Sequence, residues 1–130
     1  MNLRGISYYL SLSCYPVTLL SFFNILYSSY FNHYLNLDSY ILTLVTSLLL
    51  GVGLYLFSKN SEKNIKFYEK LVLLFIVYFF ISLLISIPYY FGNYKLSFIN
   101  AYFEAVSGLT TTGFTVFYNV KFLDPTLIIW

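Results

Sequence analysis

Three long hydrophobic runs, separated by short polar stretches, make up most of the first 91 residues. They extend from Ile6 to about Phe31, from Ser39 to Ser58 and from Leu71 to about Phe91. At about 1.5 Å per residue, each run is long enough to cross a hydrocarbon layer roughly 30 Å thick. The pattern predicts three transmembrane helices, with a kink at Pro16 in the first and with Pro88 marking the end of the third.

The hydrophobic pattern changes after the third run. Ser97 is suited to cap a helix that starts at Phe98 and ends near residue 108, because its hydroxyl accepts a bond from a free backbone N–H. Such a helix is about 16 Å long, which is half a bilayer. Ala101, Ala105 and Gly108 follow the spacing i, i+4, i+7, so we expect one smooth face for close packing.

Composition places the chain in a membrane. Of its 130 residues, 59% are hydrophobic and only 9% are charged, whereas soluble domains have about 25% charged residues. A small soluble fold has too little interior to bury so much apolar surface. The net charge of +2 is too small to indicate a nucleic-acid partner.

The positions of the basic residues predict the orientation of the three helices. Arg4 precedes the first run, and the loop between the first two contains Asp38 but no Lys or Arg. Cytoplasmic loops are enriched in basic residues, so we expect the N-terminus and the loop 59–70 in the cytoplasm. The segment from Gly92 onward then begins on the outer side. The basic residues of the loop are Lys59, Lys63, Lys66 and Lys70.

The stretch 101–117, "AYFEAVSGLTTTGFTVF", combines a short helix with a hydroxyl-rich run. A half-span helix that enters from outside directs its partially negative C-terminal end at the membrane midplane. We expect Thr110 to Gly113 to return outward in extended form, with carbonyl groups that must face protein or a water-filled path. Free carbonyls at such a place favour a dehydrated cation, as in a potassium filter. Composition alone favours the alternative, a plain external loop.

The same stretch strongly resembles the first pore loop of the Trk/Ktr/HKT potassium transporters, and most closely the TrkH type. TrkH-type proteins have two additional N-terminal membrane helices before their first pore repeat, as this chain has, whereas Ktr-type proteins lack them. The resemblance implies an all-α integral membrane fold: three transmembrane helices, then a re-entrant pore helix and a selectivity-filter loop. The matching residues are Phe103, Glu104, Ser107, Gly108 and Leu109, followed by Thr110, Thr111, Thr112 and Gly113.

The resemblance also implies roles for individual residues. Thr111 and Thr112 would supply backbone oxygens that coordinate potassium, and Thr110 and Gly113 would flank or extend that site. Gly113 corresponds to the family's filter glycine, which sets the backbone bend. Glu104 would support the loop through hydrogen bonds, because a carboxylate at that depth needs partners.

Ser107 and Gly108 complete the predicted support of the filter. The resemblance divides the chain into two parts. Residues 1–66 would form a cytoplasmic N-terminus, two leading helices (about 6–31 and 39–58) and the basic loop. Residues 67–130 would form an incomplete first pore repeat: a helix at about 67–91, a pore helix at about 98–109, the filter at 110–114 and the start of a second helix at about 125–130. Asp124 is suited to cap that helix and Pro125 to occupy its first turn.

TrkH-type proteins have four such repeats, so we expect this chain to be the N-terminal piece of a longer transporter that does not enclose a pore alone. The predicted function is passive potassium transport in the bacterial inner membrane, with no enzymatic step and no cofactor. The family also implies a homodimer and a cytosolic, nucleotide-binding TrkA-like regulatory subunit. The alternative is a small three-span membrane interaction or scaffold protein, in which the Thr/Gly run is only an external loop.

Overall fold

The computed structural model describes residues 3–59 and 64–130, and this part of the chain is helical. Three of its helices are long and apolar enough to cross a membrane, which confirms the prediction of three spans. Each begins two to four residues before the predicted hydrophobic run. The elements are α1 (Leu3–Phe31), α2 (Leu37–Ser58), α3 (Phe67–Phe91), α4 (Phe98–Leu109), a 3₁₀ turn η1 (Val120–Phe122) and α5 (Pro125–Ile129).

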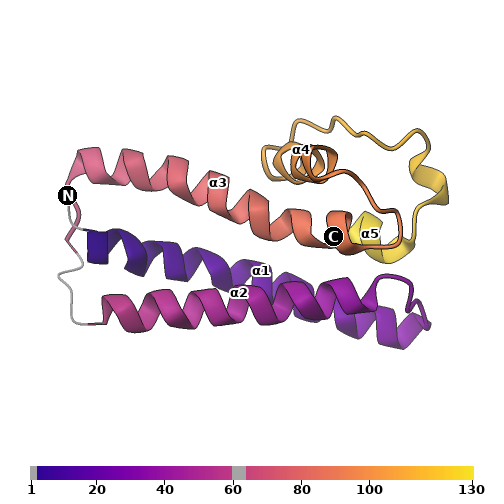
Figure 1. Cartoon of the computed structure of the whole chain (residues 1–130), viewed down its shortest axis with the longest axis horizontal. Helices are drawn as coiled ribbons and strands as arrows, with labels where there is room; N and C mark the ends of the chain where they lie inside the picture. Colours follow the sequence, from indigo (N-terminus) through magenta and orange to yellow (C-terminus); the bar gives the residue numbers. More distant parts are fainter. Residues whose placement is uncertain (1–2, 60–63) are drawn as a thin grey trace.

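Helices α1 and α2 form an antiparallel hairpin whose interface consists largely of small residues (Figure 1). At Gly51 an added Cβ would lie 3.2 Å from the Cβ of Cys14, so the two backbones approach closely there. Serines on this interface bond to carbonyls of their own helix, for example Ser21 Oγ to Val17 O at 2.9 Å. Small side chains and satisfied hydroxyls are what helix pairs in lipid use, because lipid supplies no hydrophobic drive for association.

Helix α3 packs against both members of the hairpin. Buried apolar side chains from α1 and α3, which we call the mid-bundle cluster, fill the contact: Cys14, Val17, Ile81 and Leu84. The outer surfaces of the long helices are strongly apolar, with Phe75 74% and Leu49 65% exposed. Such surfaces are suited to lipid rather than to water.

The third helix ends at Phe91, as predicted, and Pro88 lies inside its last turn. The N–H of Gly92 still bonds to Pro88 O at 2.9 Å. A proline lacks its own N–H, so it removes a bond to the turn before it and leaves the following turn intact. Pro16 likewise lies inside α1, which is continuous across it.

The two ends of the bundle differ (Figure 1). The loop that joins α1 to α2, the turn between α3 and α4, and α5 gather at one end, and the link between α2 and α3 lies at the other. The basic positions at that end are Lys59, Lys66 and, in the first turn of α3, Lys70, whereas Lys63 lies outside the described residues. The predicted orientation, with the basic end in the cytoplasm, would make the end with α5 the outer one. We call it the outer end below.

Candidate functional site

Helix α4 packs against α3 and lies beside its outer half (Figure 1). Near its start, the ring of Phe98 lies 6.1 Å from that of Tyr90, and one turn later Tyr102 lies 5.9 Å from Phe79. Its last residue, Leu109, packs on the mid-bundle cluster. Ser97 caps the helix as predicted, by accepting a bond from the Asn100 N–H.

The smooth face predicted on α4 is only partly correct. Ala101 and Ala105 are buried, at 0% and 1% exposure. Gly108 is exposed, and an added Cβ there would meet no described atom within 4 Å. Gly108 therefore lies outside the packed contact, although Leu109 beside it packs on the mid-bundle cluster. Sequence spacing predicts which residues share a face, but the crossing of two helices decides how far along that face they touch.

The chain turns sharply where α4 ends. Thr112 N–H bonds to Ser107 O at 3.0 Å, and Thr111 N–H bonds to Gly108 O at 3.1 Å. This pair of bonds is the Schellman pattern, which places one residue in the left-handed region and usually selects glycine there. Here that residue is Thr111, with φ of 57°. A β-branched residue in this region is an outlier, with a cost of roughly 1–2 kcal/mol.

The expected extended form of the segment 110–113 needs correction. Thr110 and Thr111 form a turn and not the start of an extended strand, because the Schellman bonds close the helix there; Thr112 and Gly113 have no regular secondary structure. Gly113 takes a left-handed conformation (φ 74°), as its predicted role in a bend requires. Thr111 is left-handed as well, whereas Gly108 is an ordinary helical residue.

The threonine hydroxyls of this turn are occupied by the protein itself. Thr110 Oγ1 donates to Val106 O at 2.7 Å, and Thr111 Oγ1 donates to Thr110 O at 2.7 Å. Thr112 Oγ1 donates to Ser107 O at 3.1 Å. Each hydroxyl therefore stabilises the turn, and one lone pair of Thr110 O is already used.

The backbone oxygens that follow are not occupied in this way. In the part of the chain that the structure describes, nothing donates a hydrogen bond to the backbone oxygens of Thr111, Thr112 or Gly113. All three residues are exposed. Three consecutive carbonyl groups are thus available to a ligand, directly after the partially negative end of a helix.

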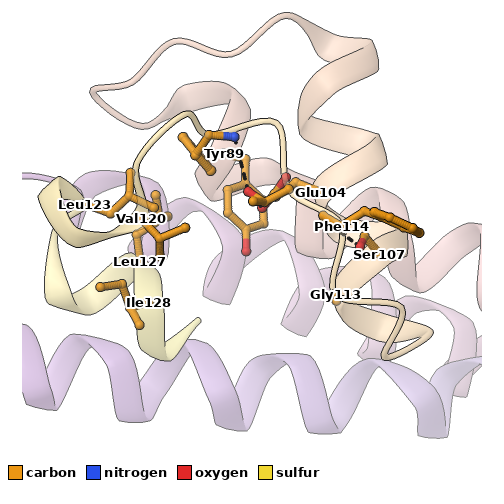
Figure 2. Close-up of a pocket in the computed structure, with 12 residues that line it drawn as sticks. Tyr89, Glu104, Ser107, Gly113, Phe114, Val120, Leu123, Leu127 and Ile128 are labelled. Carbon is orange, nitrogen blue, oxygen red and sulfur yellow. Dashed lines mark hydrogen bonds between the residues drawn. The ribbon is translucent and has the colours of Figure 1, made fainter.

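Two side chains of α4 hold the segment that leaves this turn (Figure 2). Glu104, which is half-buried, accepts through both oxygens: from the Thr115 hydroxyl at 2.6 Å and from the Val116 N–H at 3.0 Å. Ser107 Oγ donates to Phe114 O at 2.6 Å. We call these three bonds the α4 tether. They fix the outgoing segment to the same helix that precedes the turn.

A cavity of about 260 Å³ lies behind the tethered segment, between α3, α4 and α5 (Figure 2). Its polar wall includes Glu104 and Ser107, and α5 supplies Leu127 and Ile128. Because the space behind it is open, the segment owes its position to the α4 tether more than to packing.

The chain then returns to the outer end of the bundle. The ring of Phe117 lies 6.4 Å from Tyr89 on α3 and 5.9 Å from Tyr94 just beyond it. Asp124 caps α5 by accepting from the Thr126 N–H at 2.9 Å, as the sequence predicts. The loop 110–124 therefore starts at the level of the mid-bundle cluster and finishes at the end from which α4 began.

The sequence predicted that the residues at the end of α4 form one site, but it did not predict several hydrogen-bond partners. Thr115 and Val116 were not expected to bind Glu104, and Asn36 and Tyr94 were not expected near Asp124. The glutamate and the threonine are eleven residues apart, so only the turn at 110–113 brings them together. Asn36 precedes α2 directly, a position that predicts local capping rather than a distant contact.

Comparison with known proteins gives one distant relative. The chain is 28% identical over 98 residues to an uncharacterized cation transporter of Methanocaldococcus jannaschii, a match that covers 75% of this chain and 21% of that protein. The chain thus spans about a fifth of the length of the curated relative it matches. No protein-family model matches the chain. No solved structure matches it either. The chain is therefore a multi-pass membrane protein with distant similarity to a cation transporter.

Proposed function

We propose that this chain is a segment of a passive, potassium-selective transporter of the TrkH type, with α4 as its pore helix and residues 110–114 as its filter. One observation carries the proposal: the free backbone oxygens of Thr111, Thr112 and Gly113 follow the end of a helix that reaches the middle of the bundle. Carbonyl groups at membrane depth must be buried in protein or line a water-filled path. A dehydrated potassium ion would satisfy these oxygens, because they would replace its hydration shell.

The roles of the site residues follow from their bonds. Thr111 and Thr112 coordinate the ion through backbone oxygens, and Gly113 extends the site and supplies the bend. Thr110 flanks it, since its oxygen already accepts from the Thr111 hydroxyl. The strained backbone of Thr111 supports the proposal, because residues held in sparse regions of φ and ψ cluster at functional sites.

Glu104 and Ser107 act as supports rather than as ligands. Both oxygens of Glu104 are already used by Thr115 and Val116, and the Ser107 hydroxyl is used by Phe114. Gly108 supports the site differently: its bare, exposed surface lets further pore elements approach the helix end closely.

The rest of the proposal concerns the assembly. One filter segment surrounds only part of an ion, so the remaining pore repeats of a TrkH-like chain would complete the site. The assembly would lie in the cytoplasmic membrane with the N-terminus inside, as a homodimer in contact with a TrkA-like regulatory subunit. The relative's description as a cation transporter supports the class of cargo, and the resemblance of residues 101–116 to the TrkH-type pore loop is the ground for proposing potassium.

Potassium uptake in a bacterium that lacks its own uptake systems tests the function. The chain is expressed alone and together with the reading frame that follows it, and growth is measured at limiting potassium. We expect rescue only from the longer product. Gly113→Ser should then reduce discrimination between potassium and sodium, because serine tolerates φ of 74° poorly.

Gly53→Ser is the matched control, since Gly53 has open space around it and lies in α2. Rescue by the chain alone would contradict the need for further repeats. Selectivity that is unchanged by Gly113→Ser, in a product shown to reach the membrane, would contradict the filter and favour the three-span scaffold with an external loop.

A further inference from the structure

A second group of polar side chains, far from the filter segment in sequence, meets at the outer end of the bundle. It joins the loop between α1 and α2, the turn after α3, and the start of α5. We propose that Asn36 is the positioning residue of this junction and that it fixes the far end of the loop 110–124. The hairpin of α1 and α2 would then hold the loop 110–124 in place.

The side chain of Asn36 does not cap its own helix, α2. Asn36 stands at the N-cap of α2, yet it makes no capping bond, and it is only 2% exposed. Its Oδ1 accepts from the Asn93 N–H at 2.9 Å, and its Nδ2 donates to Asp124 Oδ2 at 3.4 Å. An asparagine at an N-cap normally bonds to its own helix. Here both ends of the amide connect segments 57 and 88 residues away.

Asp124 is the other half of the junction and is 5% exposed. Its Oδ1 accepts from the Thr126 N–H and from the Thr126 hydroxyl, both at 2.9 Å, and its own N–H donates to the Tyr94 hydroxyl at 2.7 Å. A buried carboxylate is stable only when its oxygens are bonded. The amide of Asn36 satisfies Oδ2.

The residues around Asn36 and Asp124 are closely packed. At Gly92 an added Cβ would lie 2.9 Å from Asn36 Oδ1, so the backbone after α3 is pressed against the amide. Tyr40, one turn into α2, donates to Thr126 Oγ1 at 3.1 Å, and its ring lies 5.6 Å from that of Trp130. The hairpin therefore touches the start and the end of α5.

The loop 110–124 consequently has two anchors. One is the α4 tether at Phe114, Thr115 and Val116, and the other is the cap residue Asp124. Between them lie residues 117–123, beside an open cavity. The inference concerns where this loop is held and needs no potassium, so a failure of the proposed transport function would leave it testable.

An exchange of the two side chains tests the junction. Asn36→Asp sets two acceptors against each other, and Asp124→Asn sets two amide donors against each other. The double variant N36D/D124N restores every bond. The carboxylate now at position 36 accepts from the Asn93 N–H and from the amide now at position 124, and that amide still caps α5 through its oxygen. Asn32→Asp is the control, since it adds the same charge to an exposed position of the same loop and keeps its acceptor for the Tyr34 hydroxyl.

The measurement is amide hydrogen exchange of the whole chain in lipid nanodiscs. We expect each single variant to accelerate exchange about tenfold at the hydrogen-bonded amides of residues 121–124, with the amides of α1 and α3 unchanged. The double variant should return within about twofold of the parent. A merely structural role would accelerate all helices together.

Two results would overturn the inference: single variants that exchange like the parent, or a double variant as fast as the singles. If the single variants do not accumulate in the membrane, the double variant decides. Its recovery with parental exchange supports the junction, and its loss refutes it.

Discussion

Glu104→Gln is the most direct test of how the filter segment is held. The substitution keeps the size of the side chain but replaces one acceptor oxygen with an NH₂ group. In the native chain both oxygens accept, from the Thr115 hydroxyl at 2.6 Å and from the Val116 N–H at 3.0 Å. The amide oxygen can still accept one bond and its NH₂ group can donate to the Thr115 hydroxyl, so the substitution chiefly removes the negative charge that strengthens both bonds.

The expected magnitude follows from these contacts. A hydrogen bond to a charged group contributes about 1.5–3 kcal/mol. Glu104 is half-buried and Thr115 is exposed, so water compensates part of the loss. We expect a net cost near the lower limit, about 1.4 kcal/mol, which corresponds to a tenfold larger population of the released segment.

Exchange of the Val116 amide, measured by NMR in nanodiscs, reports that population directly. We expect about tenfold faster exchange at Val116. Glu69→Gln is the control: Glu69 accepts from the Lys66 N–H at 2.9 Å in the capping box of α3, a role that glutamine also fills. Exchange at Val116 that changes less than twofold, or that rises equally in the control, would refute the tether.

Three further predictions concern the stability of the fold, measured as the free energy of unfolding in mixed micelles. Gly92→Ala should cost about 2–4 kcal/mol, because the new methyl group would overlap Pro88 O and Asn36 Oδ1, whereas Gly53→Ala, in open space, should stabilise α2 slightly; equal effects would contradict the packing. Thr126→Val should cost about 1–3 kcal/mol, since the buried Tyr40 hydroxyl loses its partner, and an unchanged stability would contradict that bond. Asn24→Leu should raise stability by about 1 kcal/mol, because neither polar atom of the 1%-exposed side chain has a partner among the described residues; a loss of stability would indicate a polar partner outside them.

Much of this structure follows from short-range rules that act on the sequence alone. The three spans follow from the length of uncharged runs, because a helix satisfies its own backbone groups in lipid. The starts of α4 and α5 follow from Ser97 and Asp124, since a cap needs only a side-chain oxygen and free N–H groups one turn away. The left-handed Gly113 follows from the freedom of glycine.

The predictions for Gly108 and for the segment 110–113 were wrong because they used local patterns, whereas the contacts between helices and the bonds at the helix end decide both. Gly108 was expected to share the packed face of Ala101 and Ala105, but it is exposed and faces open space. The Schellman bonds place a left-handed residue at Thr111, where no glycine stands. The extended strand was expected from free carbonyls, but the helix end closes into a turn before the chain can extend. Neither bond pattern nor crossing angle is encoded in the spacing of residue types.

Hydrophobic length, capping residues and charge position determine how many helices the chain forms, where they start and which end is basic. The tertiary structure alone decides which atoms remain available and what holds them. It pairs Glu104 with Thr115, and it turns Asn36 from its own helix toward an aspartate 88 residues away. These bonds depend on the relative placement of separately formed helices, and that placement is settled by packing in three dimensions and not by any pattern along the chain.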